Sequence, residues 1–233
     1  MSEPGGGDER YAIYFVPPAD SALYRFGSSV LGYDCRGGRD CGFPAGAASG
    51  WPRCVREPRV YGFHATLKPP FRLRPGTSPA ELQAALKSFA VSRRPIDAGL
   101  LRLTAFGNFI ALVPAAPCAA IDALAADCVR VFDAFRKPME PGERDRRAVP
   151  SLTGRQLSHL DAWGYPYVFD EFRFHMTLTG PLADTERAFA FDWLGKQWAQ
   201  HEAAHPLRLD RVVLLRQAGF AFVVVAEAAF AAV

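Results

Sequence analysis

Two histidines occupy matching positions in two similar stretches of this chain. His64 stands two residues before Thr66, and His175 stands two residues before Thr177; the wider pattern Phe-His-x-Thr-Leu-x-x-Pro occurs at both places, 111 residues apart. With an unperturbed pKa of about 6.5, one neutral imidazole can take a proton while a protonated one gives a proton. Threonine hydroxyls can donate hydrogen bonds to phosphate oxygens. The sequence therefore predicts phosphoester chemistry, with these four residues as the catalytic group.

Both motifs are predicted to lie on β-strands, at 60–67 and 172–178. Side chains two residues apart in a strand share a face. Lys68 then shares the face of the first motif's histidine and threonine, and Arg173 and Thr179 share that of the second. The opposite face of the second strand is wholly apolar. We expect these three side chains to bind the phosphate group, with the two basic ones neutralising its charge.

Two tyrosines complete the expected substrate-binding set. Tyr14 lies on the less apolar face of a predicted strand over 10–16, so it is expected to reach the cleft. Tyr167, together with Tyr165, can stack on a base or a ribose. Packing of these rings beside Pro166 is an equally good interpretation.

The chain is organised as a repeat. Each half is predicted to run as strand, helix, histidine strand, helix, strand, with approximate repeats at 10–107 and 109–227. Tight turns at Gly107 and Gly219 indicate hairpins and hence antiparallel pairing. The prediction is an α+β fold in a single domain over 1–233, with two lobes related by a pseudo-twofold axis, flanking helices and a central cleft.

Several helices have clear start signals. Capping boxes begin at Ser78 and Thr153, and Gly164 is suited to ending the second of these helices. The segment 32–58 is rich in Gly, Pro and Cys and is expected to be a long loop, whereas 138–150 is expected to break regular structure. Further helices are predicted at 20–31, 119–135 and from Asp184 to about Ala204.

Longer stretches of the chain resemble a known family. The tetrapeptides HATL and HMTL are similar to the paired motifs of the two-histidine phosphoesterase superfamily, which includes LigT-like RNA 2′,5′-ligases and cyclic phosphodiesterases. RYAIYFVPP, LYRFGSSVLGYD, YGFHATLKPPFRL, WGYPYV and FRFHMTLTG resemble a branch described as phosphonate-metabolism proteins. The resemblance covers nearly the whole chain, except 35–54. It implies a bilobed α+β fold with both His-x-Thr pairs in the cleft and no metal.

Composition limits the other possibilities. The 233 residues are 49% hydrophobic and 22% charged, which is typical of a globular protein, and the net charge of +3 without a long basic run gives no case for duplex DNA or RNA. No apolar segment reaches the roughly 20 residues that span a bilayer. We expect no signal peptide, reduced thiols and a cytoplasmic location.

Two metal sites are conceivable, and both are weaker interpretations. Cys35, Cys41 and Cys54 share one glycine-rich segment, but their spacing matches no familiar zinc site. His201 to His205 fits the pattern H-E-x-x-H, but Pro206 disfavours a helical conformation at the second histidine. We expect no metal and no other cofactor.

The leading hypothesis is an enzyme that hydrolyses a cyclic phosphodiester of a ribose-containing small molecule, with phosphonate metabolism as its expected context. One alternative is an RNA-end 2′,3′-cyclic phosphodiesterase or 2′,5′-ligase-like enzyme, and another is a non-catalytic binder of phosphorylated ligands. The expected partner is a small phosphorylated substrate, in preference to RNA or a membrane, and the expected state is a monomer.

Overall fold

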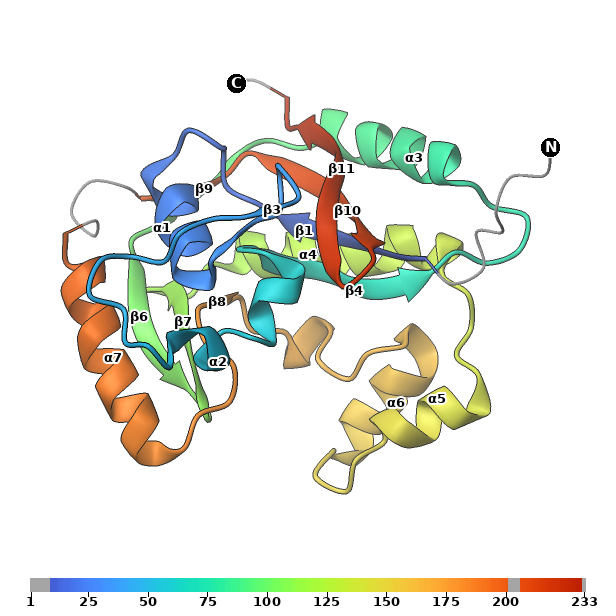
Figure 1. Cartoon of the computed structure of the whole chain (residues 1–233). Helices are drawn as coiled ribbons and strands as arrows, with labels where there is room; N and C mark the ends of the chain where they lie inside the picture. Colours follow the sequence, from blue (N-terminus) through green and yellow to red (C-terminus); the bar gives the residue numbers. More distant parts are fainter. Residues whose placement is uncertain (1–8, 201–205, 232–233) are drawn as a thin grey trace.

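The computed structural model describes residues 9–200 and 206–231, whose arrangement Figure 1 shows. Its centre is a seven-stranded sheet in which every neighbouring pair of strands is antiparallel. In spatial order the strands are β11 (Ala221–Ala229), β10 (Arg211–Ala218), β1 (Arg10–Phe15), β4 (Ala65–Arg72), β8 (Met176–Thr177), β7 (Phe109–Pro114) and β6 (Leu101–Phe106). Two small sheets pair β2 (Tyr33–Asp34) with β3 (Arg39–Asp40), and β5 (Ile96–Gly99) with β9 (Leu207–Leu209).

Apart from the additional edge strand β11, the strand order is the same on both sides of the β4–β8 pair. These two central strands follow the two histidines, and β1 and β7, the opening strands of the two halves, lie outside them. Next come β10 and β6, so that each half's closing strand pairs with the opening strand of the other half. This arrangement confirms the predicted antiparallel α+β fold, with both halves sharing one continuous sheet.

Helices cover the sheet and its ends (Figure 1). The α-helices are α1 (Ala22–Leu31), α2 (Trp51–Cys54), α3 (Pro79–Val91), α4 (Ala119–Phe132), α5 (Pro141–Arg147), α6 (Gly154–Trp163) and α7 (Asp184–Trp198). Three 3-10 turns are η1 (Pro58–Tyr61), η2 (Asp133–Phe135) and η3 (Phe169–Glu171). Helix α3 packs on β10 and β11, α4 on β4, and α7 on β6 and β7.

The helix boundaries follow local hydrogen bonding. Both predicted capping boxes are present: Ser78 begins α3 and Thr153 begins α6. Ser21 caps α1 by accepting a hydrogen bond from the backbone N–H of Tyr24 at 3.0 Å. Gly164 ends α6 in the left-handed conformation that glycine adopts without steric cost.

Strand β1 separates two apolar clusters. Tyr11, Ile13 and Phe15 point into the main core, which α1, α3, α4 and α7 complete. The alternate residues, Tyr14 among them, point to a smaller cluster on the other face, with residues of β10 and β11. This alternation agrees with the prediction from sequence.

Four of the predicted boundaries are wrong. A 3-10 turn occupies 58–61, so β4 begins only after His64, and β8 has two residues where a strand of seven was expected. The segment 138–150 contains α5, a short helix that begins at a proline. Helix α7 begins at Asp184, as predicted, but it ends at Trp198, before the predicted end near Ala204.

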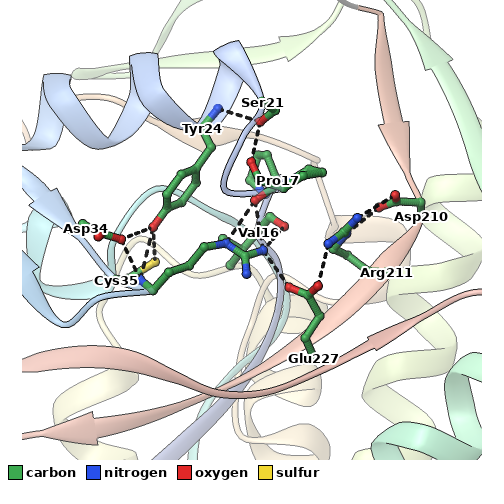
Figure 2. Close-up of polar contacts among 11 residues, drawn as sticks. Val16, Pro17, Ser21, Tyr24, Asp34, Cys35, Asp210, Arg211 and Glu227 are labelled. Carbon is green, nitrogen blue, oxygen red and sulfur yellow. Dashed lines mark hydrogen bonds and ion pairs between the residues drawn. The ribbon is translucent and has the colours of Figure 1, made fainter.

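The glycine-rich segment 32–58 is built into the fold. It contains the β2–β3 hairpin and α2. The Arg36 side chain donates hydrogen bonds to the carbonyls of Val16 and Pro17 and forms a 2.7 Å ion pair with Glu227. Figure 2 shows Glu227 also meeting Arg211, at 2.5 Å. The segment is therefore attached both to the end of β1 and to β11.

A second set of contacts in Figure 2 joins the same segment to α1. The Tyr24 hydroxyl donates to Asp34 at 2.7 Å and lies 3.6 Å from the Cys35 sulfur. Burial raises the pKa of the Cys35 thiol to about 11, so this thiol stays protonated and unreactive at neutral pH. No helix in the described part of the chain has the length and apolar character needed to cross a bilayer.

Candidate active site

The two motifs meet in the middle of the sheet. Ala65 of β4 lies directly opposite Met176 of β8, and both side chains are buried in the main core. Because successive side chains of a strand alternate between faces, the residues before and after this pair point to the other face. The motifs are therefore adjacent on one sheet, where a pairing across a cleft was expected.

The register places each histidine beside the threonine of the other motif. Counting outward from the central pair of an antiparallel ladder, His64 lies opposite Thr177 and Thr66 lies opposite His175. The residues that line the cavities agree: His64 and Thr177 line one chamber, and Thr66 and His175 line its neighbour. We call these four residues, which the sequence predicts to be catalytic, the catalytic quartet.

Both imidazoles are oriented by the backbone in the same way. The Nδ1 atom of His64 lies 2.8 Å from the carbonyl oxygen of Gly62, and that of His175 lies 2.7 Å from the carbonyl oxygen of Arg173. A carbonyl only accepts, so Nδ1 carries the hydrogen in each neutral ring and Nε2 is left free to take a proton. The Thr66 hydroxyl lies 3.1 Å from Nε2 of His64. Each of these carbonyls accepts a hydrogen bond from a histidine side chain in place of one from a neighbouring strand. Regular strand pairing therefore begins only after each histidine.

Burial makes both histidines weak bases. It lowers the pKa of His64 to about 4, a change that the Gly62 carbonyl opposes and the nearby charge of His175 enhances. Burial also lowers the pKa of His175, against the effect of the Arg173 carbonyl. A bound phosphodiester anion would raise both pKa values, because a nearby negative charge favours the imidazolium.

Tyr14 forms a wall for the first histidine. Its ring stacks on His64 with centroids 3.7 Å apart and an interplanar angle of 16°. Tyr14 itself is 1% exposed, so the ring has little room to move. The stack and the Gly62 hydrogen bond together fix the direction of Nε2 of His64.

The cavity has two adjoining chambers. The His64 chamber has a volume of about 390 Å³ and includes Tyr14, Glu57, Tyr61 and Thr177. The His175 chamber has a volume of about 520 Å³. Its aromatic wall contains Phe106, Phe109, Tyr165, Tyr167, Phe169 and Phe172. Thr66, Pro69, Phe109 and Tyr165 line both chambers, so the quartet lies where they meet.

Three phenol groups gather in the His64 chamber, from Tyr14, Tyr61 and Tyr165. Burial raises the pKa of Tyr14 well above its usual value and that of Tyr165 to about 12, and each of these two phenols also responds to the charge of Tyr61. Tyr14 and Tyr165 therefore remain neutral at physiological pH, and a neutral phenol can donate a hydrogen bond to a bound oxygen atom.

The structure places most of the expected substrate-binding residues near the quartet. Tyr167 lines the His175 chamber and is 45% exposed. Thr179 lines the His64 chamber, but its hydroxyl accepts a hydrogen bond from the backbone N–H of Ile110 at 3.0 Å, which gives it a structural task. Arg173 lines the His175 chamber, and its Nη1 donates to the carbonyls of Asp170 and Phe172.

Lys68 lies elsewhere, which corrects the argument from strand alternation. Its ammonium group is 2.7 Å from Asp133 and 3.3 Å from the carbonyl of Val129, and its side chain is 1% exposed. The cause is a bulge: consecutive residues of β1 pair with Thr66 and Lys68, so Leu67 is an extra residue in β4. The bulge turns Lys68 toward α4, away from the cavity.

Sequence reasoning missed the contribution of the glycine-rich segment and its continuation into η1. Glu57, Pro58 and Tyr61 line the His64 chamber, and the backbone N–H of Gly180 donates to the carbonyl of Cys54 at 2.7 Å. No periodic pattern in that segment indicated these contacts. The four phenylalanines of the aromatic wall were also missed, although Phe106 and Phe109 flank the predicted hairpin turn.

Gly62 explains how this segment supports the histidine. Its φ of +72° lies in the left-handed region, and a Cβ there would come within 2.4 Å of the Cys35 Cβ. A larger residue would displace the carbonyl that holds Nδ1 of His64. The close approach of Gly62 to Cys35 is therefore part of how the catalytic ring is positioned.

Of the two suggested metal sites, the structure describes only the one formed by the three cysteines. The sulfur atoms of Cys35, Cys41 and Cys54 lie near three different partners: the Tyr24 hydroxyl and the carbonyls of Ser28 and Gly50. Within 9–200 and 206–231, no group of three or more His, Cys, Asp or Glu residues is placed to hold a metal ion. The H-E-x-x-H pattern at 201–205 lies outside the described residues.

A family model described as "Protein of unknown function (DUF1045)" matches residues 66–222. This chain belongs to the DUF1045 family. The matched region of this DUF1045 chain includes Thr66, His175 and Thr177, and begins two residues after His64.

Two curated relatives carry the name "Ribose 1,5-bisphosphate phosphokinase PhnN". The protein from Janthinobacterium sp. (strain Marseille) is 36% identical over 220 residues, which are 89% of this chain and 47% of that protein. The protein from Laribacter hongkongensis (strain HLHK9) is 32% identical over 216 residues, 91% of this chain and 50% of that protein. The DUF1045 chain thus spans about half the length of these relatives.

Two solved structures are also similar. One is described as "Crystal structure of phosphoesterase", with 14% identity and a TM-score of 0.41 over 96% of this chain and 99% of the other. The second is described as "Crystal structure of E.coli LigT complexed with 3'-AMP", with 12% identity, the same TM-score of 0.41 and the same shares of the two chains.

Proposed function

We propose that this DUF1045 protein is a metal-independent phosphoric diester hydrolase that opens a cyclic phosphodiester of a ribose-containing small molecule. The observation that carries the proposal is the catalytic quartet, in which two histidines with backbone-selected tautomers alternate with two threonines on one sheet face. The proposed enzyme is a cytoplasmic monomer of one domain, and its substrate arises in phosphonate breakdown.

In the proposed reaction, Nε2 of His64 takes a proton from a water molecule whose oxygen attacks phosphorus. The bond from phosphorus to one sugar oxygen breaks, and His175 gives that oxygen a proton. The products are a phosphate monoester and a free hydroxyl group. His64 is assigned as the base because its pKa of about 4 keeps it neutral over the wider pH range. Thr66 and Thr177 donate to the non-bridging oxygens as negative charge develops.

The relatives support a ribose-containing substrate. Their name refers to an activity on ribose 1,5-bisphosphate, and this chain matches about half of each of them. Opening a cyclic 1,2-phosphodiester of ribose 5-phosphate at O2 leaves the phosphate on O1, which gives ribose 1,5-bisphosphate. We therefore propose that the reaction proceeds from such a cyclic ester to the compound named for the relatives.

The test is a turnover assay on ribose cyclic phosphates, followed by phosphorus NMR of the products. The proposal expects conversion of a cyclic ester to a monoester by the wild type and about a hundredfold slower conversion by His64→Ala and His175→Ala. The matched control is His159→Ala. His159 is hydrogen-bonded to Asp170 outside both chambers, so this variant should leave turnover unchanged. Binding without turnover would instead indicate a non-catalytic binder.

The aromatic wall favours a second candidate, an enzyme that acts on RNA ends. Exposed rings such as Tyr167, together with Phe109 and Phe172, offer stacking surfaces of the kind that single-stranded bases use. Competition between a ribose cyclic phosphate and an oligonucleotide with a 2′,3′-cyclic end separates the two candidates. A kcat/KM that is higher for the oligonucleotide would favour the RNA-end enzyme.

A further inference from the structure

A basic hollow lies next to the catalytic chambers. It has a volume of about 90 Å³, and Pro69 and Pro70 line both it and the His64 chamber. Six basic and two acidic side chains contribute to its lining: Arg10, Lys68, Arg72, Arg136, Lys137 and Arg147, with Glu140 and Glu143. By contrast, Arg173 is the one basic residue among those that line the two catalytic chambers in the described part of the chain.

The sheet brings these cations together. Arg10 of β1 lies directly opposite Arg72 of β4 in the strand register. On the other side of β4, the backbone N–H of Lys137 donates to the carbonyl of Arg72 at 2.8 Å. Three neighbouring backbone segments thus present basic side chains to one hollow. Like charges directly opposite each other in a sheet are destabilising, unless a counter-charge separates them.

The carboxylates on the inner side neutralise only part of this charge. Asp133 accepts from both Lys68 and Arg136, each at 2.7 Å. Hydrogen bonds from both cations hold the pKa of Asp133 below its usual value, although burial alone would raise it. One carboxylate is therefore shared by two cations.

The outer side has the same imbalance. Glu143 lies 2.8 Å from Arg147 and 3.8 Å from Arg72, so it too is shared. Arg10 donates to the neutral amide of Gln217 at 2.7 Å, and no carboxylate among the residues of 9–200 and 206–231 lies within ion-pair distance of it. Glu140 pairs with Lys137, and among the described residues that line the hollow the basic side chains outnumber the acidic ones by six to two.

We propose that this hollow binds a phosphate group. Its volume of about 90 Å³ exceeds the roughly 10–15 Å³ that a cavity needs to hold one water molecule, so it has room for a compact anion. Planar guanidinium groups offer paired donors that match phosphate oxygens, which an exposed lysine can supplement. The phosphate is either a second phosphate carried by the substrate or a separate inorganic phosphate ion. The inference does not depend on the proposed hydrolysis.

Calorimetric titration with inorganic phosphate tests the site. All proteins carry His175→Ala, so that the quartet contributes equally and turnover is suppressed. The control for Lys137→Gln is Lys196→Gln. Like Lys137, Lys196 is exposed and forms an ion pair with a carboxylate nearby in the sequence, that of Asp192. Arg10→Gln is matched by Arg208→Gln, whose guanidinium pairs with Asp97 away from the hollow.

The proposal expects each substitution in the hollow to weaken phosphate binding by about tenfold or more, with both controls unchanged. Equal affinity in all four variants, or no binding to the parent protein, would overturn it. If Arg10→Gln fails to fold, Lys137→Gln decides the question, because this side chain is 41% exposed.

A competition experiment then identifies the source of the phosphate. If the substrate carries it, saturating inorganic phosphate should weaken binding of a ribose cyclic phosphate that bears a second phosphate, and leave the unphosphorylated ester unaffected. If the phosphate is a separate ion, both esters should bind equally well in its presence. Phosphate binding with no turnover of any ester would uphold the site while contradicting the hydrolase.

Discussion

Ala65 and Met176 face each other across the β4–β8 pair, and this pairing determines the geometry of the catalytic quartet. A shift of the register by one residue would turn the side chains of one strand to the opposite face of the sheet. The histidine of that strand would then move into the core. Both side chains are buried, at 1% and 0% exposure, so the apolar core itself specifies the register. The packing of the core and the alignment of the catalytic groups thus have the same cause.

The pH dependence of catalysis should be shifted to acid. With a pKa of about 4 for His64 and a lowered pKa for His175, the bell-shaped profile of kcat/KM should have its maximum below pH 6.5. His64→Ala should remove the acid limb and His175→Ala the alkaline limb, each with a loss of roughly a hundredfold. The double variant should be little worse than the poorer single one, because the two groups act as a unit. Full activity in either single variant would end the two-histidine hypothesis.

Burial of His64 should also make the folded protein less stable at acid pH. Between about pH 6.5 and 4, His64 becomes protonated in the unfolded chain but stays neutral in the folded protein. The free energy of unfolding therefore decreases as the pH falls. The contribution of His64 is at most roughly 3 kcal/mol. Urea unfolding at pH 7 and pH 4.5 should show a smaller decrease for His64→Gln than for the wild type. An identical decrease in both proteins would contradict the buried, neutral state of this ring.

Tyr14 should act as a positioning residue through its ring. Tyr14→Phe keeps the stack on His64 and should retain the kcat and pH profile of the wild type, apart from any hydrogen bond that the phenol makes to substrate. Tyr14→Leu removes the stack and should lower kcat by about ten- to a hundredfold, with a smaller change in KM. Equal kcat values for the two variants, both folded by circular dichroism, would show that the ring does not orient His64.

Loss of the Lys68 side chain should reduce stability, whereas loss of the Arg173 side chain should weaken substrate binding. Lys68→Met breaks a buried ion pair and should reduce the free energy of unfolding by about 3 kcal/mol or more, with kcat/KM per folded molecule little changed. Arg173→Ala removes an exposed side chain at the His175 chamber and should mainly raise KM, by about 1–3 kcal/mol in binding. Denaturant titration and steady-state kinetics on both variants measure this contrast. A stable Lys68→Met protein with a raised KM would restore the original assignment.

Chelation should leave activity intact. The two imidazoles of the proposed mechanism supply both proton transfers, so the reaction requires no metal-bound water. Turnover should be the same before and after dialysis against EDTA. Loss of turnover that zinc or manganese restores would replace this mechanism with a metal-dependent one.

The sequence predicted those parts of the fold that depend on neighbouring residues. The capping boxes at Ser78 and Thr153 and the alternating faces of β1 follow from local hydrogen bonding and strand periodicity. Lys68 was misplaced because a one-residue bulge turns its side chain to the other face of the strand, and no local pattern marks this bulge. The contribution of Tyr61 and the segment before it depends on long-range contacts, such as Gly62 against Cys35, which periodicity does not encode.

The symmetric strand order has a consequence for the origin of the fold. The closing strand of each half pairs with the opening strand of the other, so either half alone would expose an unpaired central strand and half of an active site. Two identical half-length chains could pair through those edges about a twofold axis, as in an isologous dimer. Each would then supply one histidine and one threonine. Fusion of such an ancestor into one chain would free the halves to diverge. The halves now differ in the bulge beside Lys68 and in the length of β8, which has two residues.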